Sequence, residues 1–358
     1  MRTFSCVCGQ TLFFENVACE NCRREVGWCP SCHAIAAIES LGDGTYRCAN
    51  TGCGATLVKC TNYAFEHVCN RCLPVPAANG GLCDACRFNR TIPDLSVEGN
   101  RERWAELEAA KRRLLYTLDF LRLPYGSADE GFDPPLAFDF KADAIPSEGV
   151  WRWMGAGERV YTGHADGKIT INIREADSVE REKLRVDMGE AHRTLVGHFR
   201  HEIGHYFWDL LVRGRCEDDF KRTFGDHENL SYGEALQRHY AIGPPLDWRD
   251  RFVSAYATMH PWEDWAETFA LYLDITSVLD TASKMGLIGA VDFGDLNGMV
   301  GQYRRLGLVL NELNREMGLM DVVPEVLHAA VVEKLGFVHG LVRRQAEGRE
   351  AAYDLGAA

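Results

Sequence analysis

The stretch "FRHEIGHYFW", residues 199–208, places two histidines four positions apart, with a glutamate directly after the first. Residues four apart share one face of a helix, so the imidazoles of His201 and His205 can reach one metal ion. Glu202 then stands where a carboxylate can take a proton from an attacking water and pass it to a leaving amine. A pattern this short also arises by chance, so the sequence around it has to support a catalytic zinc.

The surrounding sequence predicts a helix over 190–212 and a β-hairpin before it. Five apolar residues form a stripe distinct from the face of the two histidines: Leu195, Phe199, Ile203, Phe207 and Leu210. The hairpin turns at Asp166 and Gly167, and it could supply an edge strand along which a peptide substrate pairs. Helical periodicity also predicts helices over 101–123, 231–241, 247–259, 262–280 and within 301–350.

A catalytic zinc needs a third protein ligand and one open position. The segment "YATMHPWEDWAETFALYL", residues 256–273, is the candidate source. Glu263 and Glu267 lie four apart and share a helical face, so one can bind zinc while the other orients a ligating histidine. Tryptophan, phenylalanine and leucine are interleaved with them, which indicates a buried acidic pair. Asp264 and His260 remain alternative ligands, and for His198 we expect packing or hydrogen bonding.

Thirteen of the 14 cysteines precede residue 87, and twelve of these form six short pairs. Each pair brings two thiolates to one tetrahedral ion, and two pairs complete a closed structural zinc site. Pairing of neighbours predicts three such sites: Cys6, Cys8, Cys19 and Cys22; Cys29, Cys32, Cys48 and Cys53; Cys69, Cys72, Cys83 and Cys86. An interleaved arrangement stays open. Cys60 and Cys216 are left without a site, and we expect both to be small buried apolar residues.

Charge and composition narrow the function classes. The chain has 358 residues and a formal charge of -13, yet residues 1–90 are nearly neutral, with eight Lys/Arg against seven Asp/Glu. A nucleic-acid surface needs basic residues for counterion release, so protein contact is favoured over nucleic acid. The first residues lack a secretory pattern, and charges interrupt the apolar windows before they could span a bilayer. We expect a cytoplasmic protein without a membrane segment, in which cysteine pairs bind metal.

Several stretches together resemble one known family. They are "CVCGQTLFFEN", "CRFNRTIPDLS", "GHADGKITINIREAD", "GHFRHEIGHYFWD", "FVSAYATMHPWEDWAETFA" and "LQRHYAIGPP". They resemble the bacterial zinc-binding metallopeptidases that carry an N-terminal zinc-ribbon domain. The likeness covers most of the chain and is weakest over its last sixty or so residues. The family's substrates are not implied, and the short Cys6-x-Cys8 spacing departs from the usual two-residue spacer.

The "ExxAE" arrangement is also similar to gluzincins of the anthrax lethal factor type. That resemblance implies that Glu263 is the third zinc ligand and that Glu267 supports a histidine ligand. Those enzymes place a tyrosine two helical turns before the ligand, where its hydroxyl stabilises the oxyanion. Tyr256 stands seven residues before Glu263 and matches, while His260 is a second candidate for this role.

Taken together, the sequence predicts an α+β protein with small zinc-ribbon modules before a gluzincin-like domain that is mostly helical with a small sheet. The expected parts are 1–90 with three four-cysteine sites, 91–125 as linker and connecting helix, and 126–358 as a metallopeptidase domain. The polar stretch 87–100 is expected to be the linker itself. We expect one catalytic and about three structural Zn²⁺ ions, a protein or peptide substrate, and endopeptidase activity. A zinc-ribbon scaffold that contacts a protein partner, or a protease directed to DNA-bound proteins, are the alternative functions.

Overall fold

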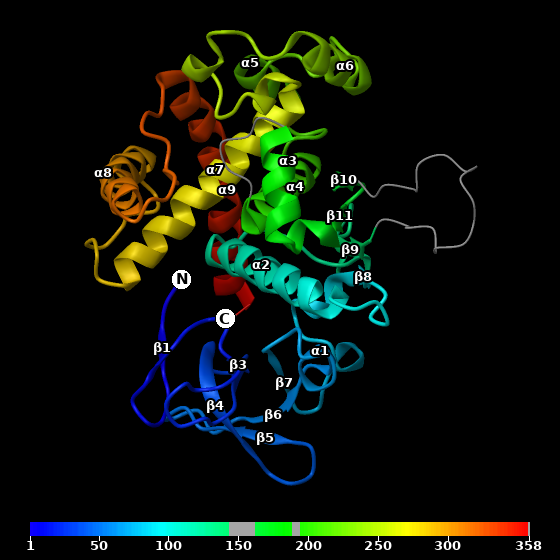
Figure 1. Cartoon of the computed structure of the whole chain (residues 1–358), viewed down its shortest axis with the longest axis vertical. Helices are drawn as coiled ribbons and strands as arrows, with labels where there is room; N and C mark the ends of the chain where they lie inside the picture. Colours follow the sequence, from blue (N-terminus) through cyan, green and yellow to red (C-terminus); the bar gives the residue numbers. More distant parts are fainter. Residues whose placement is uncertain (143–161, 188–193, 357–358) are drawn as a thin grey trace, which may run out of the picture.

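The computed structural model describes residues 1–142, 162–187 and 194–356. Figure 1 shows the cysteine-rich part at one end of the molecule, with the long helices stacked beyond it. Helices and small sheets coexist in one chain, so the expected α+β class agrees with the structure. Within the described residues, no helix is both long enough and apolar enough to cross a membrane.

The cysteine-rich part consists of short antiparallel strands. Strands β1 (Phe4–Ser5) and β2 (Thr11–Leu12) form a two-stranded ribbon. A five-stranded sheet has the order β3-β4-β5-β6-β7, with the strands Val26–Cys29, Ala34–Ser40, Tyr46–Cys48, Thr56–Lys59 and Cys72–Pro74. The short helix α1 (Thr61–Ala64) follows β6. Strands this short bury little apolar surface of their own, so metal binding would supply much of their stability.

A second sheet lies beside the helices. Its order is β10-β11-β9-β8, with the strands Gly163–Ala165, Lys168–Asn172, Ala137–Lys141 and Asn89–Thr91. The predicted hairpin is confirmed, since β10 pairs with β11 antiparallel around Asp166 and Gly167. Gly167 is required there, because its φ is 77° and an added Cβ would lie 2.1 Å from the carbonyl oxygen of Pro135.

One expectation about this sheet agrees with the structure and another is wrong. The hairpin supplies an edge strand, as expected, because β10 lies at one edge of the described sheet, next to β11. The stretch 87–100 is not only a linker, because β8 lies within it and pairs in parallel with β9. The sequence did not predict this strand because its side chains are polar. In the structure Arg90 and Thr91 both donate hydrogen bonds to the buried Asp139 of β9.

The helical part is built around two crossing helices. They are α4 (Leu195–Leu211) and α7 (Pro261–Lys284), and α2 (Asn100–Phe120) packs beneath α4 (Figure 1). The remaining helices are α3 (Ser178–Asp187), α5 (Glu217–Phe224), α6 (Tyr232–Ile242), α8 (Leu296–Glu316) and α9 (Ala329–Gly356). One hydrophobic core joins α2, α4, α5, α7, α8 and α9 to the five-stranded sheet, and Phe138 and Phe140 of β9 pack on Phe199 of α4 within it.

The helix expected over 247–259 is also wrong. Only two 3-10 turns form there, at Trp248–Asp250 and Tyr256–Thr258. A tertiary contact accounts for the break between them. The buried ammonium of Lys334 donates a hydrogen bond of 2.7 Å to the carbonyl oxygen of Arg251 and lies 4.1 Å from the ring centroid of Phe252. That carbonyl oxygen therefore bonds a side chain of α9 and not the N–H of a continued helix.

Candidate metal centre

Helix α4 carries the two histidines on its partly exposed side. Thr194 caps the helix by accepting a hydrogen bond from the backbone N–H of Gly197. Phe199, Ile203 and Phe207 are fully buried on the opposite side, which fixes the rotation of the helix. The Nε2 atoms of His201 and His205 consequently lie 3.3 Å apart and point at one place.

Helix α7 brings a carboxylate to that place. His260 caps this helix by accepting a hydrogen bond from the N–H of Trp262, and Pro261 begins it. The first turn carries Glu263, whose Oε2 lies 3.0 Å from His201 Nε2 and whose Oε1 lies 3.4 Å from His205 Nε2. One donor atom from each of the three residues lies within 4.8 Å of the donor atoms of the other two.

This donor set suits zinc. Two imidazoles and one carboxylate are the three protein ligands of many catalytic zinc sites, and they leave a fourth position for water or substrate. Glu263 is almost completely buried, and a buried carboxylate without a cation beside it would be costly. The three residues named from the sequence are therefore together in space, as a catalytic zinc would need.

Glu267 supports one of the imidazoles. Its Oε1 lies 2.7 Å from Nδ1 of His201, so this carboxylate holds the ring with Nε2 directed at Glu263. Burial raises the pKa of Glu267, but the hydrogen bond to His201, the charge of that ring and a hydrogen bond from Ser254 together outweigh burial and leave the pKa below its ordinary value. An ionised Glu267 is what a histidine ligand needs behind it, because the negative charge makes the ring more basic.

Glu202 is buried next to the histidines. Only 7% of its surface is exposed, and burial raises the pKa of this carboxyl above the ordinary value for glutamate. A general base works best when its pKa approaches the working pH, so the direction of this shift suits proton transfer. The structure places Glu202 where the sequence motif predicts it, on the helix turn between the two ligand candidates.

The residues considered as other ligands lie in other contacts. Asp264 forms a buried ion pair with Lys334 of α9, with 2.6 Å between Oδ2 and Nζ. His260 is engaged as the helix cap. His198 contacts the carboxylate of Glu175. None of these three residues joins the group of His201, His205 and Glu263 in the described structure.

Two tyrosines approach the centre. The ring of Tyr256 lies 6.2 Å from the ring of His201, centroid to centroid. The hydroxyl of Tyr232, from α6, donates a hydrogen bond of 3.0 Å to Glu263 Oε1, and the two phenols also contact each other. Burial raises the pKa of both tyrosines well above the ordinary value. Each hydroxyl therefore stays protonated and can donate a hydrogen bond to an anionic oxygen.

Sequence reasoning missed Tyr232 and His164. Tyr232 is separated from Glu263 by 31 positions, and nothing in "SYGEALQRHYA" distinguishes it from a surface residue. His164 lies on β10, with its ring stacked 6.3 Å from that of His205. Its Nε2 accepts a hydrogen bond from the N–H of Gly167, and burial lowers the pKa of His164 to about 3. Strand β10 therefore runs beside the centre with a neutral imidazole.

The cysteines gather into three four-sulfur clusters. The first two contain the residues grouped from the sequence, with Sγ–Sγ distances such as 3.6 Å for Cys6–Cys22 and 3.7 Å for Cys29–Cys53. Thiolates at such separations suit tetrahedral zinc. Zinc is therefore the metal that both kinds of site favour.

The third cluster differs from the expected one. It contains Cys60, Cys69, Cys83 and Cys86, so Cys60 takes the place expected for Cys72. Cys72 belongs to β7, and its Sγ lies 3.0 Å from where a Cβ of Gly27 would be, on β3, which contacts β7 although the two strands end the sheet order. Cys60 lies between β6, which ends at Lys59, and α1, and its sulfur accepts a hydrogen bond from the N–H of Cys83. Cys72 pairs with Lys59, the last residue of β6, and successive residues of an extended chain point to opposite sides, so Cys60 and Cys72 face different sides.

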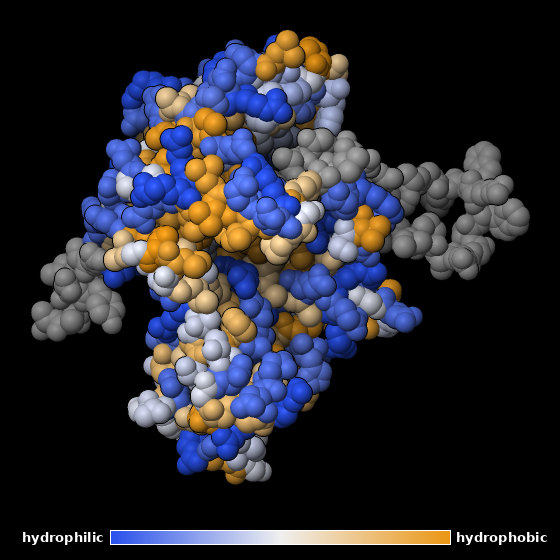
Figure 2. Space-filling view, turned by 60° about the vertical axis from the view of Figure 1, so that its left-hand side comes forward, coloured by the Kyte–Doolittle hydropathy of each residue, from blue (hydrophilic) through white to orange (hydrophobic). Residues whose placement is uncertain are grey.

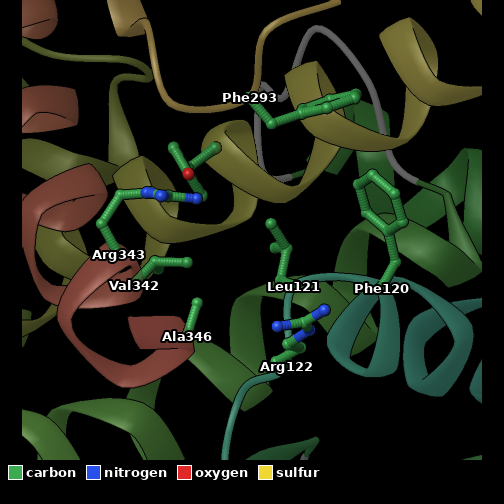
Figure 3. Close-up of a pocket in the computed structure, with 8 residues that line it drawn as sticks. Phe120, Leu121, Arg122, Phe293, Val342, Arg343 and Ala346 are labelled. Carbon is green, nitrogen blue, oxygen red and sulfur yellow. The ribbon is translucent and has the colours of Figure 1, made fainter. Parts of the chain in front are cut away.

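A separate cavity of about 190 Å³ lies between the end of α2 and α9 (Figure 3). It is lined by Phe120, Leu121, Arg122, Tyr272, Phe293, Val342, Arg343 and Ala346. None of these residues contributes to the metal centre.

Comparison with known proteins agrees with this geometry. Residues 100–341 match the family model described as "Putative zinc-binding metallo-peptidase", and residues 3–97 match a zinc-ribbon domain. Uncharacterized proteins of Mycobacterium tuberculosis and Mycobacterium bovis are 40% identical to the chain, over 99% of its length and 98% of theirs. No solved structure matches the chain. The metallopeptidase match begins where α2 begins, so it includes the helix that we expected to be a connector.

Proposed function

Since the chain belongs to the zinc-binding metallopeptidase family, we propose that it hydrolyses peptide bonds at a zinc ion held by His201, His205 and Glu263. The single observation that supports this most strongly is the meeting of these three donors from two helices beside a buried Glu202. The arrangement is gluzincin-like, because the third donor is a glutamate from a later helix. In this proposal the three four-cysteine clusters hold structural zinc ions.

The reaction divides among residues of this chain. A bound zinc ion would polarise the scissile carbonyl and make an attacking water more acidic. Glu202 takes the proton of that water and then delivers it to the leaving amine. Tyr256 donates a hydrogen bond to the oxygen of the tetrahedral intermediate, and Glu267 keeps the imidazole of His201 oriented.

The test of this function is Glu202→Gln. The amide keeps the shape of the side chain but cannot accept the proton, so zinc should remain bound while cleavage falls by about 100-fold or more. Wild type and variant are compared in cell extract by unbiased identification of new peptide termini. Termini that appear equally with both proteins would refute the mechanism.

The identity of the third donor has its own test. Glu263→Ala should lower the zinc content by one ion per chain, because it removes a donor and leaves two imidazoles. Glu228→Ala is the control, since this exposed glutamate pairs only with Lys221 among the described contacts. An unchanged zinc content in Glu263→Ala would assign the role of ligand to another residue.

A further inference from the structure

Helix α6 and the loop after it form an exposed apolar surface. Ala235 is the buried residue of this helix, while Tyr240 is 65% exposed and Ile242 is 75% exposed. Leu246, in the loop, is fully exposed. Figure 2 shows hydrophobic side chains at the top of the molecule, the end at which Figure 1 places α6. Contiguous apolar residues on a protein surface commonly mark a binding site.

The same helix is attached to the metal centre by two contacts. Tyr232, in its first turn, donates to Glu263, and the ring of His239 lies 5.9 Å from that of Tyr256, edge to face. These positions are seven apart, so they share one face of α6, and Leu236 lies on that face between them. One face of α6 thus borders the centre. The apolar surface begins at Tyr240, the residue that follows His239 in the sequence.

We propose that α6 and the loop through Leu246 form a wall of the substrate site that binds a bulky apolar side chain of the polypeptide near the scissile bond. This inference rests on the proposed peptidase function and adds a substrate class to it. From Ser231 to Leu246 the chain contains one acid, Glu234, and one base, Arg238. Recognition at this wall is therefore by apolar contact and not by charge.

The substrate is favoured over a second copy of the chain as the occupant. The surface is continuous with the metal centre through Tyr232 and His239, which is where a polypeptide must lie to be cut. The net charge of -13 opposes association of like chains. A second apolar surface, on α8, includes Leu308 and Leu313, but α8 packs on the far half of α7 through Tyr303 and Asp274. That surface serves as the matched control.

The test measures peptide binding without cleavage, in zinc-loaded Glu202→Gln protein. The probes are labelled octapeptides with a central Phe, Leu, Ser, Lys or Glu between alanines and glycines, followed by fluorescence polarisation. We expect the Phe and Leu peptides to bind on the order of tenfold more tightly than the Ser peptide. Combined Tyr240→Ser, Ile242→Ser and Leu246→Ser should abolish that difference, whereas combined Leu308→Ser and Leu313→Ser should preserve it.

Three results would overturn the inference. The first is equal or absent binding of all probes. The second is an equal loss of the preference for Phe and Leu peptides in the α8 control variant. The third is a dimer in sedimentation that dissociates when the α6 residues are substituted. Because the substituted side chains are exposed, the variants should keep the circular dichroism and zinc content of the parent, which verifies folding. Selective binding without cleavage by wild type would count against the peptidase function alone, and cleavage without selectivity would count against the wall alone.

Discussion

The backbones of Gly204 and Ala266 touch where α4 crosses α7. A Cβ atom added to Gly204 would lie 3.0 Å from Cα and 3.1 Å from the carbonyl oxygen of Ala266. The indole of Trp265 donates a hydrogen bond of 2.7 Å to the carbonyl oxygen of Gly204 at the same crossing. His205 follows Gly204, and Glu267 follows Ala266, so this contact sets the distance between the helices that carry the three candidate ligands.

Gly204→Ala should therefore separate the two helices. Overpacking at a tight contact costs about 1–3 kcal/mol, and here it should also weaken zinc binding because Glu263 moves from the histidines. Thermal unfolding and zinc titration measure the two effects. Gly340→Ala on α9 is the control, since its added Cβ would meet only the end of the Arg344 side chain, at 3.6 Å. Equal melting temperatures for both variants would show that the crossing has room for a methyl group.

Removal of the carboxylate behind His201 should weaken zinc binding without removing a ligand. Glu267→Ala deletes the partner of His201 Nδ1, and loss of such a partner typically costs about 10–100-fold in metal affinity. Competition against a chelator measures the affinity. At saturating zinc the metal content should equal that of wild type, in contrast to Glu263→Ala. A content lower by one ion would make Glu267 a ligand.

Helical periodicity was enough to predict that His201 and His205 share a face, since a helix of any origin produces that relation. The position of Glu263 next to them depends on the Gly204–Ala266 crossing, which no local pattern contains. The gluzincin resemblance named Glu263, and the structure brings it to the histidines. The third cysteine cluster could not be derived from spacing, because the choice between Cys60 and Cys72 depends on which side of a strand faces the metal.

Tertiary contacts also decided the elements that the sequence misplaced. Strand β8 consists of polar residues, and it forms because Asp139 offers their side chains a buried partner. The helix expected over 247–259 is interrupted where Lys334, 83 positions later, bonds the carbonyl oxygen of Arg251. Local propensity is a weak guide where a distant side chain competes for the backbone.

Tyr232→Phe should weaken the metal centre while leaving α6 folded. The substitution removes the donor to Glu263 Oε1, and a hydrogen bond to a charged acceptor contributes about 1.5–3 kcal/mol. We expect zinc affinity to fall by about tenfold or more. Tyr240→Phe, on the same helix, removes an exposed hydroxyl and should leave the zinc affinity unchanged. If both variants bind zinc as wild type does, Tyr232 has no part in holding Glu263.

Cys60→Ser and Cys72→Ser distinguish the two possible third clusters. The structure predicts that Cys60→Ser loses one of the expected four zinc ions (three cysteine clusters plus the histidine–glutamate centre), whereas Cys72→Ser retains all four. Cys86 of this cluster lies 3.8 Å from the buried carboxylate of Glu108 on α2, so losing its zinc should also lower the melting temperature. Elemental analysis counts the ions. Loss of zinc in Cys72→Ser, with Cys60→Ser intact, would restore the pairing of neighbouring cysteines and would require β7 to present its opposite face to the cluster.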